Sequence, residues 1–138
     1  MARLDKIHHI VRNALEKDGW QITHDPYKIE YKQLTLFADL GAEKLFAAER
    51  EGKRIVVEVK SFLHASHVQD LKLALGQYDL YRVYLKLTAS ERHLYLAVDD
   101  KIYADFFRRE DIIVVIEELQ LSLLIVNLDT EEVVEWIR

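Results

Sequence analysis

The stretch RIVVEVKSF, residues 54–62, constrains the fold of this chain more than any other. Its apolar residues are mostly β-branched and nearly continuous, which is typical of a strand covered on both faces. Two charged residues, Glu58 and Lys60, nevertheless stand inside it. Burying a charge is costly unless the charge is paired or holds a metal ion. The stretch therefore predicts a sheet with a layer on each face, in which something must compensate these two charges.

The composition limits the class of protein. The length of 138 residues and the even spread of apolar residues predict a single domain over residues 1–138. There is no cysteine, which excludes disulfides and thiolate metal sites. No apolar segment approaches the ~20 residues of a membrane span, so we expect a cytoplasmic protein without membrane contact. The formal net charge of −5 means that any nucleic-acid binding requires a local basic patch or a partner protein.

The apolar spacing gives an order of helices and strands. Helices are predicted over residues 3–18 and 66–87, the second with a capping box formed by Ser66 and Gln69. Strands are predicted at 28–37, 43–50, 54–60 and 93–98, and as a closing hairpin at 121–129 and 131–138. Residues 103–110 and 111–119 are predicted to be short helices, although the β-branched run 112–116 also suits a strand. This order predicts an α/β (α+β) fold, a central mixed β-sheet flanked by helices.

A hairpin is predicted between residues 43–50 and the charged strand, because Gly52 supplies a turn. A loop of either two or four residues would place Leu45 opposite Glu58 and Glu43 opposite Lys60. Asp39 then joins the face of Glu58 and Lys60 if the first arm extends back that far. An odd loop length would break this arrangement.

Asp39, Glu58 and Lys60 on one face would suit a hard divalent ion such as Mg²⁺ or Mn²⁺. Two carboxylates can ligate the ion, whereas the ammonium of Lys60 can orient water or phosphate. These are the parts needed for phosphodiester hydrolysis. The alternative is that Glu58 and Lys60 lie at an exposed strand end, solvated or paired with neighbours. Spacing alone leaves both interpretations open.

Two motifs point in the same direction. Asp39, 18 intervening residues and then Glu58-Val59-Lys60 resemble the PD-(D/E)xK motif of the restriction-endonuclease-like superfamily, with Ala38 in place of the proline. Residues 77–81 match the QxxxY helix motif of its RecB-like members. This resemblance implies a three-layer restriction-endonuclease-like fold. It also implies a set of functional residues: Asp39 and Glu58 as metal ligands, the Val59 carbonyl and Glu16 as further ligands, Lys60 and Gln77 as catalytic residues, and Gln77 with Tyr81 bracing the site or contacting DNA.

The segments DLGAEKLFAAE, VEVKSF, ALGQYDLYR, LYLAV and EEVVEWI resemble the XisH family, the fdxN element excision controlling factors of cyanobacteria. The resemblance implies a role in DNA-element excision or rearrangement, with DNA and a small XisI-type protein as partners. A homodimer is also expected, because two sites acting on two DNA strands require two-fold pairing.

Three functions remain open at this point. The first is a Mg²⁺-dependent endodeoxyribonuclease of the PD-(D/E)xK type. The second is a non-catalytic excision-controlling factor that keeps the nuclease fold and binds an XisI-type protein or DNA. The third is a structural domain whose charged strand residues merely end a sheet edge.

Overall fold

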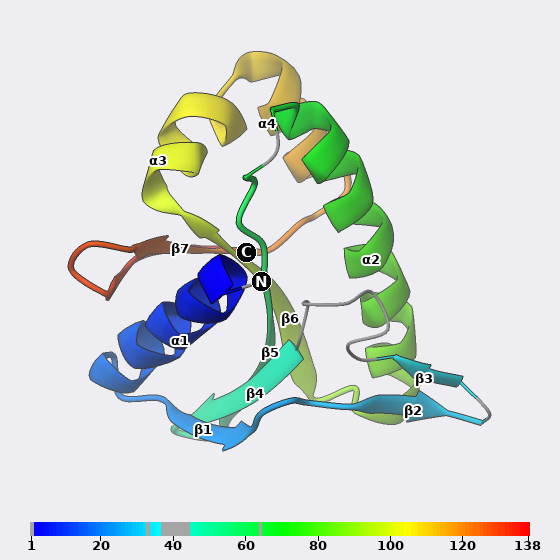
Figure 1. The fold of residues 1–138 in the computed structure, drawn as a ribbon. Helices are drawn as coiled ribbons and strands as arrows, with labels where there is room; N and C mark the ends of the chain where they lie inside the picture. The colour runs from blue at the N-terminus through cyan, green and yellow to red at the C-terminus, as the bar shows by residue number, and fades with distance from the viewer. Residues whose placement is uncertain (1, 33, 37–44, 64) are drawn as a thin grey trace.

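The structure is a computed structural model that describes residues 2–32, 34–36, 45–63 and 65–138 (Figure 1). Its helical elements are α1 (Ala2–Lys17), α2 (His67–Thr88), α3 (Asp100–Ile102), the π-helical turn η1 (Tyr103–Phe107) and α4 (Glu110–Glu118). Its strands are β1 (Gln21–His24), β2 (Ile29–Tyr31), β3 (Leu34–Leu36), β4 (Leu45–Arg50), β5 (Lys53–Val59), β6 (Arg92–Asp99), β7 (Leu123–Asn127) and β8 (Glu132–Ile137).

Six of the strands form one mixed sheet in the order β1-β4-β5-β6-β7-β8. The central strands β5, β6 and β7 are parallel, and the pairs at either side are antiparallel. Helix α2 connects β5 to β6, as a parallel connection requires. The predicted mixed sheet with flanking helices is confirmed.

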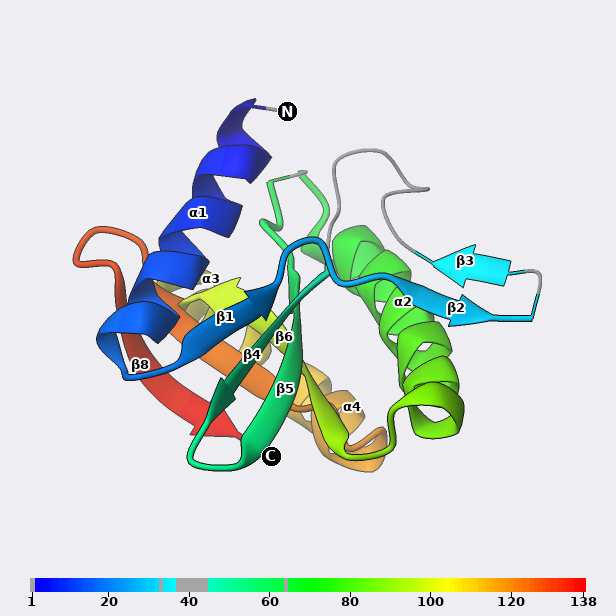
Figure 2. The same ribbon diagram turned by 90° about the horizontal axis from the view of Figure 1, so that it is seen from below.

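The sheet is covered on both faces, with α1 on one side and α2 on the other (Figures 1 and 2). The α1 face buries one apolar cluster, in which α1 packs on β4, β5, β6 and β7. The α2 face buries a second cluster, to which α4 also contributes. Side chains alternate between the two faces along each strand, so Val57 belongs to the α1 face and Val56 to the α2 face. This alternation determines where the charges of β5 point.

The helix predictions agree with the structure. Ser66 caps α2, and its hydroxyl accepts a hydrogen bond from the backbone N–H of Gln69. The β-branched run 112–116 is helical rather than extended, because Ile112 and Ile116 lie one turn apart and both enter the core. No helix within the described ranges is long and apolar enough to cross a membrane.

Two elements differ from the prediction. Strand β1 (Gln21–His24) was not predicted. Residues 28–37 were expected to form a single strand, whereas the structure has the antiparallel pair β2 and β3, with Ile29 opposite Leu36. The chain reverses next to Lys32, whose φ of 56° lies in the left-handed region. Turns of this kind usually contain glycine or asparagine, so a lysine at this position does not indicate a turn.

Candidate active site on the α2 face of strand β5

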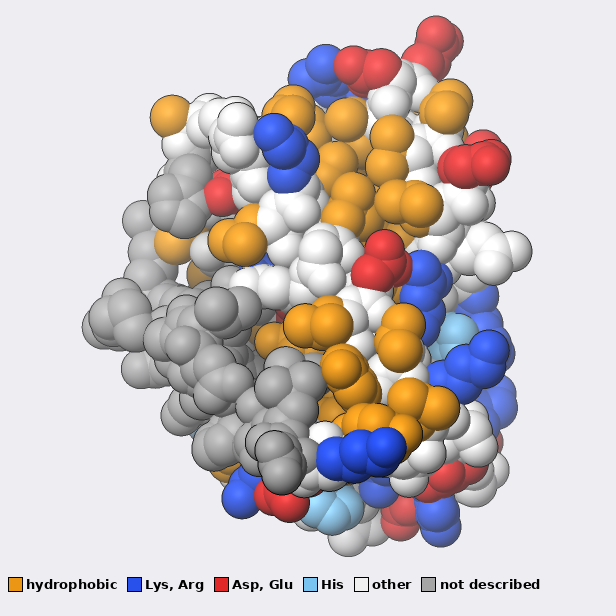
Figure 3. All heavy atoms as spheres, turned by 90° about the vertical axis from the view of Figure 1, so that its right-hand side faces the viewer, with side chains coloured by type: hydrophobic (Ala, Val, Ile, Leu, Met, Phe, Trp, Pro, Cys, Tyr) orange, Lys and Arg blue, Asp and Glu red, His pale blue; other side chains and the backbone are white. Residues whose placement is uncertain are grey.

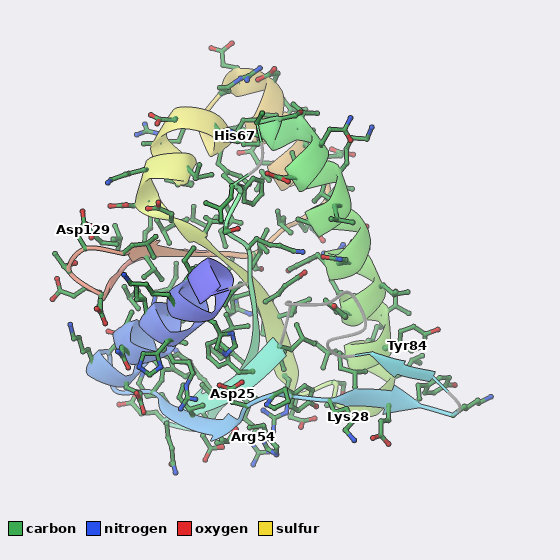
Figure 4. All side chains as sticks on the ribbon, in the orientation of Figure 1. Asp25, Lys28, Arg54, His67, Tyr84 and Asp129 are labelled. Carbon is green, nitrogen blue, oxygen red and sulfur yellow. The ribbon has the colours of Figure 1, made fainter. Side chains whose placement is uncertain are left out.

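The β4–β5 hairpin positions the two charged residues of β5. Its loop consists of Glu51 and Gly52, with φ angles of 53° and 82°, a backbone typical of a tight two-residue hairpin turn. Leu45 lies opposite Glu58 and Glu49 opposite Arg54, so the predicted register is confirmed with the shorter of the two loop lengths. In Figure 4, Arg54 marks the start of β5, and the strand runs from there toward the end of the molecule where His67 begins α2.

Both charges are buried on the α2 face. Glu58 is 1% exposed and Lys60 is 8% exposed, whereas their neighbours Val57 and Val59 pack on the α1 face. Because both groups are removed from water, solvation at a strand end does not compensate their charges. The alternative interpretation was that Glu58 and Lys60 are solvated or paired with neighbours at an exposed strand end. Of its two parts, only pairing with neighbouring groups remains.

The two charged side chains interact with each other and with α2. The Lys60 Nζ atom lies 3.8 Å from the Glu58 Oε2 atom. Lys60 also donates a hydrogen bond to the Gln77 Oε1 atom from the middle of α2. The backbone N–H of Lys60 donates to the carbonyl oxygen of Ala97, 3.1 Å away, which extends the β5–β6 pairing to this residue. Glu58, Lys60 and Gln77 therefore form one buried polar group, which we call the polar triad.

Helix α2 is fixed above the triad by two buried tyrosines. The Tyr78 hydroxyl donates to the carbonyl oxygen of Leu94 at 3.0 Å and accepts from the backbone N–H of Ser122 at 3.2 Å. Burial raises the pKa of Tyr78, so its hydroxyl stays protonated and can donate this bond. Tyr81, one turn after Gln77, is 6% exposed and lies in the core on the same face. The helix position of Gln77 is therefore determined by the hydrophobic core.

The remaining predicted site residues are placed as follows. Asp39 and the predicted pairing partner Glu43 lie outside the described residues, so the predicted Asp39 ligand stays a prediction. The side chain of Val59 points toward the α1 face; only its carbonyl was proposed as a ligand. The prediction that Glu16 is a further metal ligand is wrong. Glu16 is exposed on α1, and α1 packs on the face of the sheet opposite to the triad. The sheet therefore separates Glu16 from Glu58.

A cavity of about 260 Å³ lies at the carboxyl ends of the central strands on the α1 face, where Ile7, Ile10 and Val11 of α1 line it, and Lys60 is the member of the polar triad that reaches it. Lys60 lines it from the end of β5, Asp99 from the end of β6, and Asp129 from the loop after β7, at whose tip Figure 4 shows it. Burial raises the pKa of Asp99, and the neighbouring Asp100 acts in the same direction. Sequence reasoning missed Asp99. The available signal was the Asp99-Asp100 pair directly after the predicted strand 93–98, because ligand-binding residues often follow the carboxyl ends of parallel strands.

The donor atoms of the triad suit a hard divalent ion in part. Glu58 supplies a carboxylate, which Mg²⁺ and Mn²⁺ favour, beside an ammonium group that cannot itself ligate the ion. Within the described part of the chain, no three Asp, Glu, His or Cys side chains converge closely enough to hold an ion. Asp39, the second carboxylate of the predicted site, lies outside the described residues.

Comparison with known proteins gives one family. Residues 1–134 match the family model described as XisH protein. A solved XisH family protein from Nostoc punctiforme is 43% identical, with a TM-score of 0.89 over 96% of this chain and 99% of that one. A solved fdxN element excision controlling factor from Anabaena variabilis is 41% identical, with a TM-score of 0.89 over 97% of this chain and 99% of that one. Among curated proteins no match was found.

Proposed function

Because this chain belongs to the XisH family, we propose that it acts in the control of DNA-element excision, as a metal-dependent nuclease-like protein. The similar protein from Anabaena variabilis is described as an fdxN element excision controlling factor. In this proposal DNA is the substrate, the polar triad and Asp39 form the site, and a small XisI-type protein is a partner. The proposal extends to membership in the restriction-endonuclease-like superfamily.

The observation that carries the proposal is the buried Glu58 and Lys60 pair. Removing two charges from water costs several kcal/mol per ion, and their attraction only partly offsets that cost. The neighbouring positions 57 and 59 of the same strand are apolar and equally well buried, so strand formation does not require charges. A buried ion pair in an otherwise apolar layer is typical of a functional site.

Each residue of the triad has a distinct task in the proposed reaction. Lys60 would place a positive charge beside the scissile phosphate and stabilise the negative charge that develops during hydrolysis. Gln77 accepts a hydrogen bond from Lys60 and thereby orients the ammonium group. Glu58 and Asp39 would hold Mg²⁺ or Mn²⁺. When bound, such an ion polarises the phosphoryl oxygen and lowers the pKa of a bound water.

A second function, control of excision without cleavage, has its own supporting observation. Lys60 is engaged by both Glu58 and Gln77, so contact with a phosphate would compete with interactions that already exist. The formal net charge of −5 also gives no general attraction to DNA. A chain that keeps the fold and acts by binding a partner protein would show these same properties.

Metal titration separates the two functions. Calorimetric titration with Mn²⁺ or Mg²⁺ should give measurable heat of binding for the wild-type protein. Glu58→Gln, which keeps the shape of the side chain, should abolish it. Circular dichroism and thermal unfolding of the variant serve as the control for folding. Negligible heat with the wild-type protein would contradict the nuclease function and favour the non-catalytic one.

Turnover is the second step of the test. Supercoiled DNA incubated with Mn²⁺ should be nicked by the wild-type protein and left intact by Lys60→Met. Glu16→Gln is the matched control, because Glu16 lies on the opposite face of the sheet, and it should nick at the wild-type rate. Nicking that persists in Lys60→Met would show that a contaminant is responsible.

A further inference from the structure

Helix α2 has an outer face that carries large apolar side chains in contact with solvent. Figure 3 looks onto this side of the molecule and shows hydrophobic side chains gathered in an upper and a lower group, with an acidic side chain between them. The large apolar residues exposed on the helix, each between 45% and 57% exposed, are Val68, Leu73, Leu80, Val83 and Leu87. Exposed apolar side chains gathered in this way mark an interaction surface more often than a chance distribution of residues.

The residues of the outer face follow the spacing of a helix-packing seam. Steps of three and four residues alternate along the set that we call the outer seam: Leu73, Gly76, Leu80, Val83 and Leu87. Two helices that pack side by side with interlocking side chains show this spacing. The inner face of α2 is buried against the sheet by other residues, and the part of the chain that the structure describes leaves the outer seam exposed.

Gly76 is the second of the five residues of the outer seam. Glycine is unfavourable inside a helix because it loses more backbone freedom than alanine on folding. A Cβ atom built on Gly76 would have no atom within 4 Å, so no contact among the described residues requires glycine here. Because glycine has no side chain, Gly76 leaves a gap within the exposed apolar seam that can receive a side chain of another molecule.

We propose that two copies of this chain pair through their outer seams, with the two α2 helices antiparallel. In this arrangement Leu80 of each copy fills the gap at Gly76 of the other, and Leu73 packs against Val83. Both pairs are centred on the same point of the helix, position 78, as a two-fold axis requires. The chain thus supplies both the protruding side chain and the gap that receives it.

The charged residues along one edge of the outer seam favour a second copy of this chain as the binding partner. The Arg82 Nη1 atom donates to the carbonyl oxygens of Leu119 and Gln120, at 3.0 and 3.2 Å, so the end of α4 lies along this edge. The exposed Lys72 and Lys86 lie on the same edge, with Asp79, which is paired with Arg82, between them. The exposed residues of α4 include four acidic ones: Glu110, Asp111, Glu117 and Glu118. In an antiparallel pair the same edges meet, which brings the lysines of one copy toward the acidic helix of the other.

The seam supplies most of the area that a specific dimer needs. Helix α2 has 22 residues, which corresponds to a length of about 33 Å. A strip one helix wide, about 10–12 Å, along this length and buried on both copies amounts to roughly 660–800 Å², so contacts made by α4 must add to the outer seam to reach the ~1,000 Å² expected of a specific interface. The inference does not rest on the proposed function.

Sedimentation equilibrium of the full chain tests the proposal. The wild-type protein should be a dimer. Leu80→Glu should raise the dissociation constant by about a hundredfold or more, because it places a charge in the centre of both halves of the interface. Val134→Glu is the matched control, since Val134 on β8 is 54% exposed, and it should remain dimeric. A monomeric wild-type protein, or a dimer that Leu80→Glu leaves unchanged, would overturn the proposal.

Cysteine cross-linking tests the orientation, because the chain has no cysteine of its own. The single variants Leu73→Cys and Val83→Cys should form a disulfide with each other when mixed, and little with themselves. Cross-linking of Leu73→Cys with itself would indicate parallel helices and would overturn the antiparallel arrangement. Gly76→Leu fills the gap, so it should weaken dimerisation; an unchanged dissociation constant would contradict the role of this glycine.

Discussion

The two faces of the sheet differ although the same strands build both. On the α1 face, β5 contributes Val57 and Val59 to an apolar cluster. On the α2 face the alternating positions carry Glu58 and Lys60, which are buried as well. Since the α1 face shows how this strand is buried without charges, we attribute the charged pair to function rather than to folding. Two predictions test this difference directly. Two further predictions, with smaller expected effects, concern helix α2 and the rim of the α1 face.

Removing one partner of the charged pair should have the largest effect. Glu58→Ala leaves the Lys60 ammonium buried beside an empty space, and we expect a loss of about 3–5 kcal/mol in the free energy of unfolding. Val57→Ala on the α1 face removes only apolar contacts and should cost about 2 kcal/mol. Urea unfolding of both variants measures the difference. Equal losses in the free energy of unfolding would mean that Glu58 on the α2 face contributes no more to stability than Val57 on the α1 face.

Replacing both partners should reverse the effect. The double variant Glu58→Leu with Lys60→Met makes the α2 face apolar, and we expect stability between unchanged and about 4 kcal/mol above wild type. Lys60→Met alone, with Glu58 left in place, is the control and should be destabilised. A double variant as unstable as that control would show that the fold itself needs the pair.

A substitution at Gly76 tests how much the stability of helix α2, which holds Gln77, depends on this glycine. Gly76→Ala should raise the free energy of unfolding by about 0.5–1 kcal/mol, because alanine favours the helix and the added Cβ meets no neighbour. The measurement belongs in a Leu80→Glu background, so that dimerisation does not contribute to the observed stability. A loss of stability would reveal a contact that the described residues do not provide.

The smallest effect concerns the rim of the α1 face, where His93 lies beside Tyr95. Burial lowers the pKa of His93, with further lowering by Arg138 and Arg82. The unfolded chain therefore binds this proton more readily than the folded chain, and stability should fall as the pH drops below about 6.5. Urea unfolding at pH 7.5 and at pH 5.5 should show the loss, and His93→Gln should reduce it. A loss of the same size in His93→Gln would assign it to other groups.

Much of this arrangement is predictable from local sequence signals. The hairpin register follows from Gly52 and from a tight loop of even length, and the start of α2 follows from Ser66 and Gln69. The order of helices and strands follows from apolar periodicity. Such features depend on residues close together in the chain, where spacing alone carries the information.

The features that were missed depend on residues far apart in the chain. Glu16 was assigned to the site from the family resemblance, and local spacing could not show that α1 packs on the opposite face from Glu58. Asp99 joins the cavity beside Lys60 only because β5 and β6 are parallel neighbours. The β2–β3 turn was missed for a different reason, because a lysine occupies a conformation that usually needs glycine.

The turn of two residues between β4 and β5 has a consequence for the evolution of the family. Gaining or losing a single residue there would exchange the faces of every β4 side chain relative to β5, and Leu45 would leave the layer it shares with Glu58. Changes of two residues would preserve that layer. Relatives with a working site should therefore differ in the length of this turn only by even numbers.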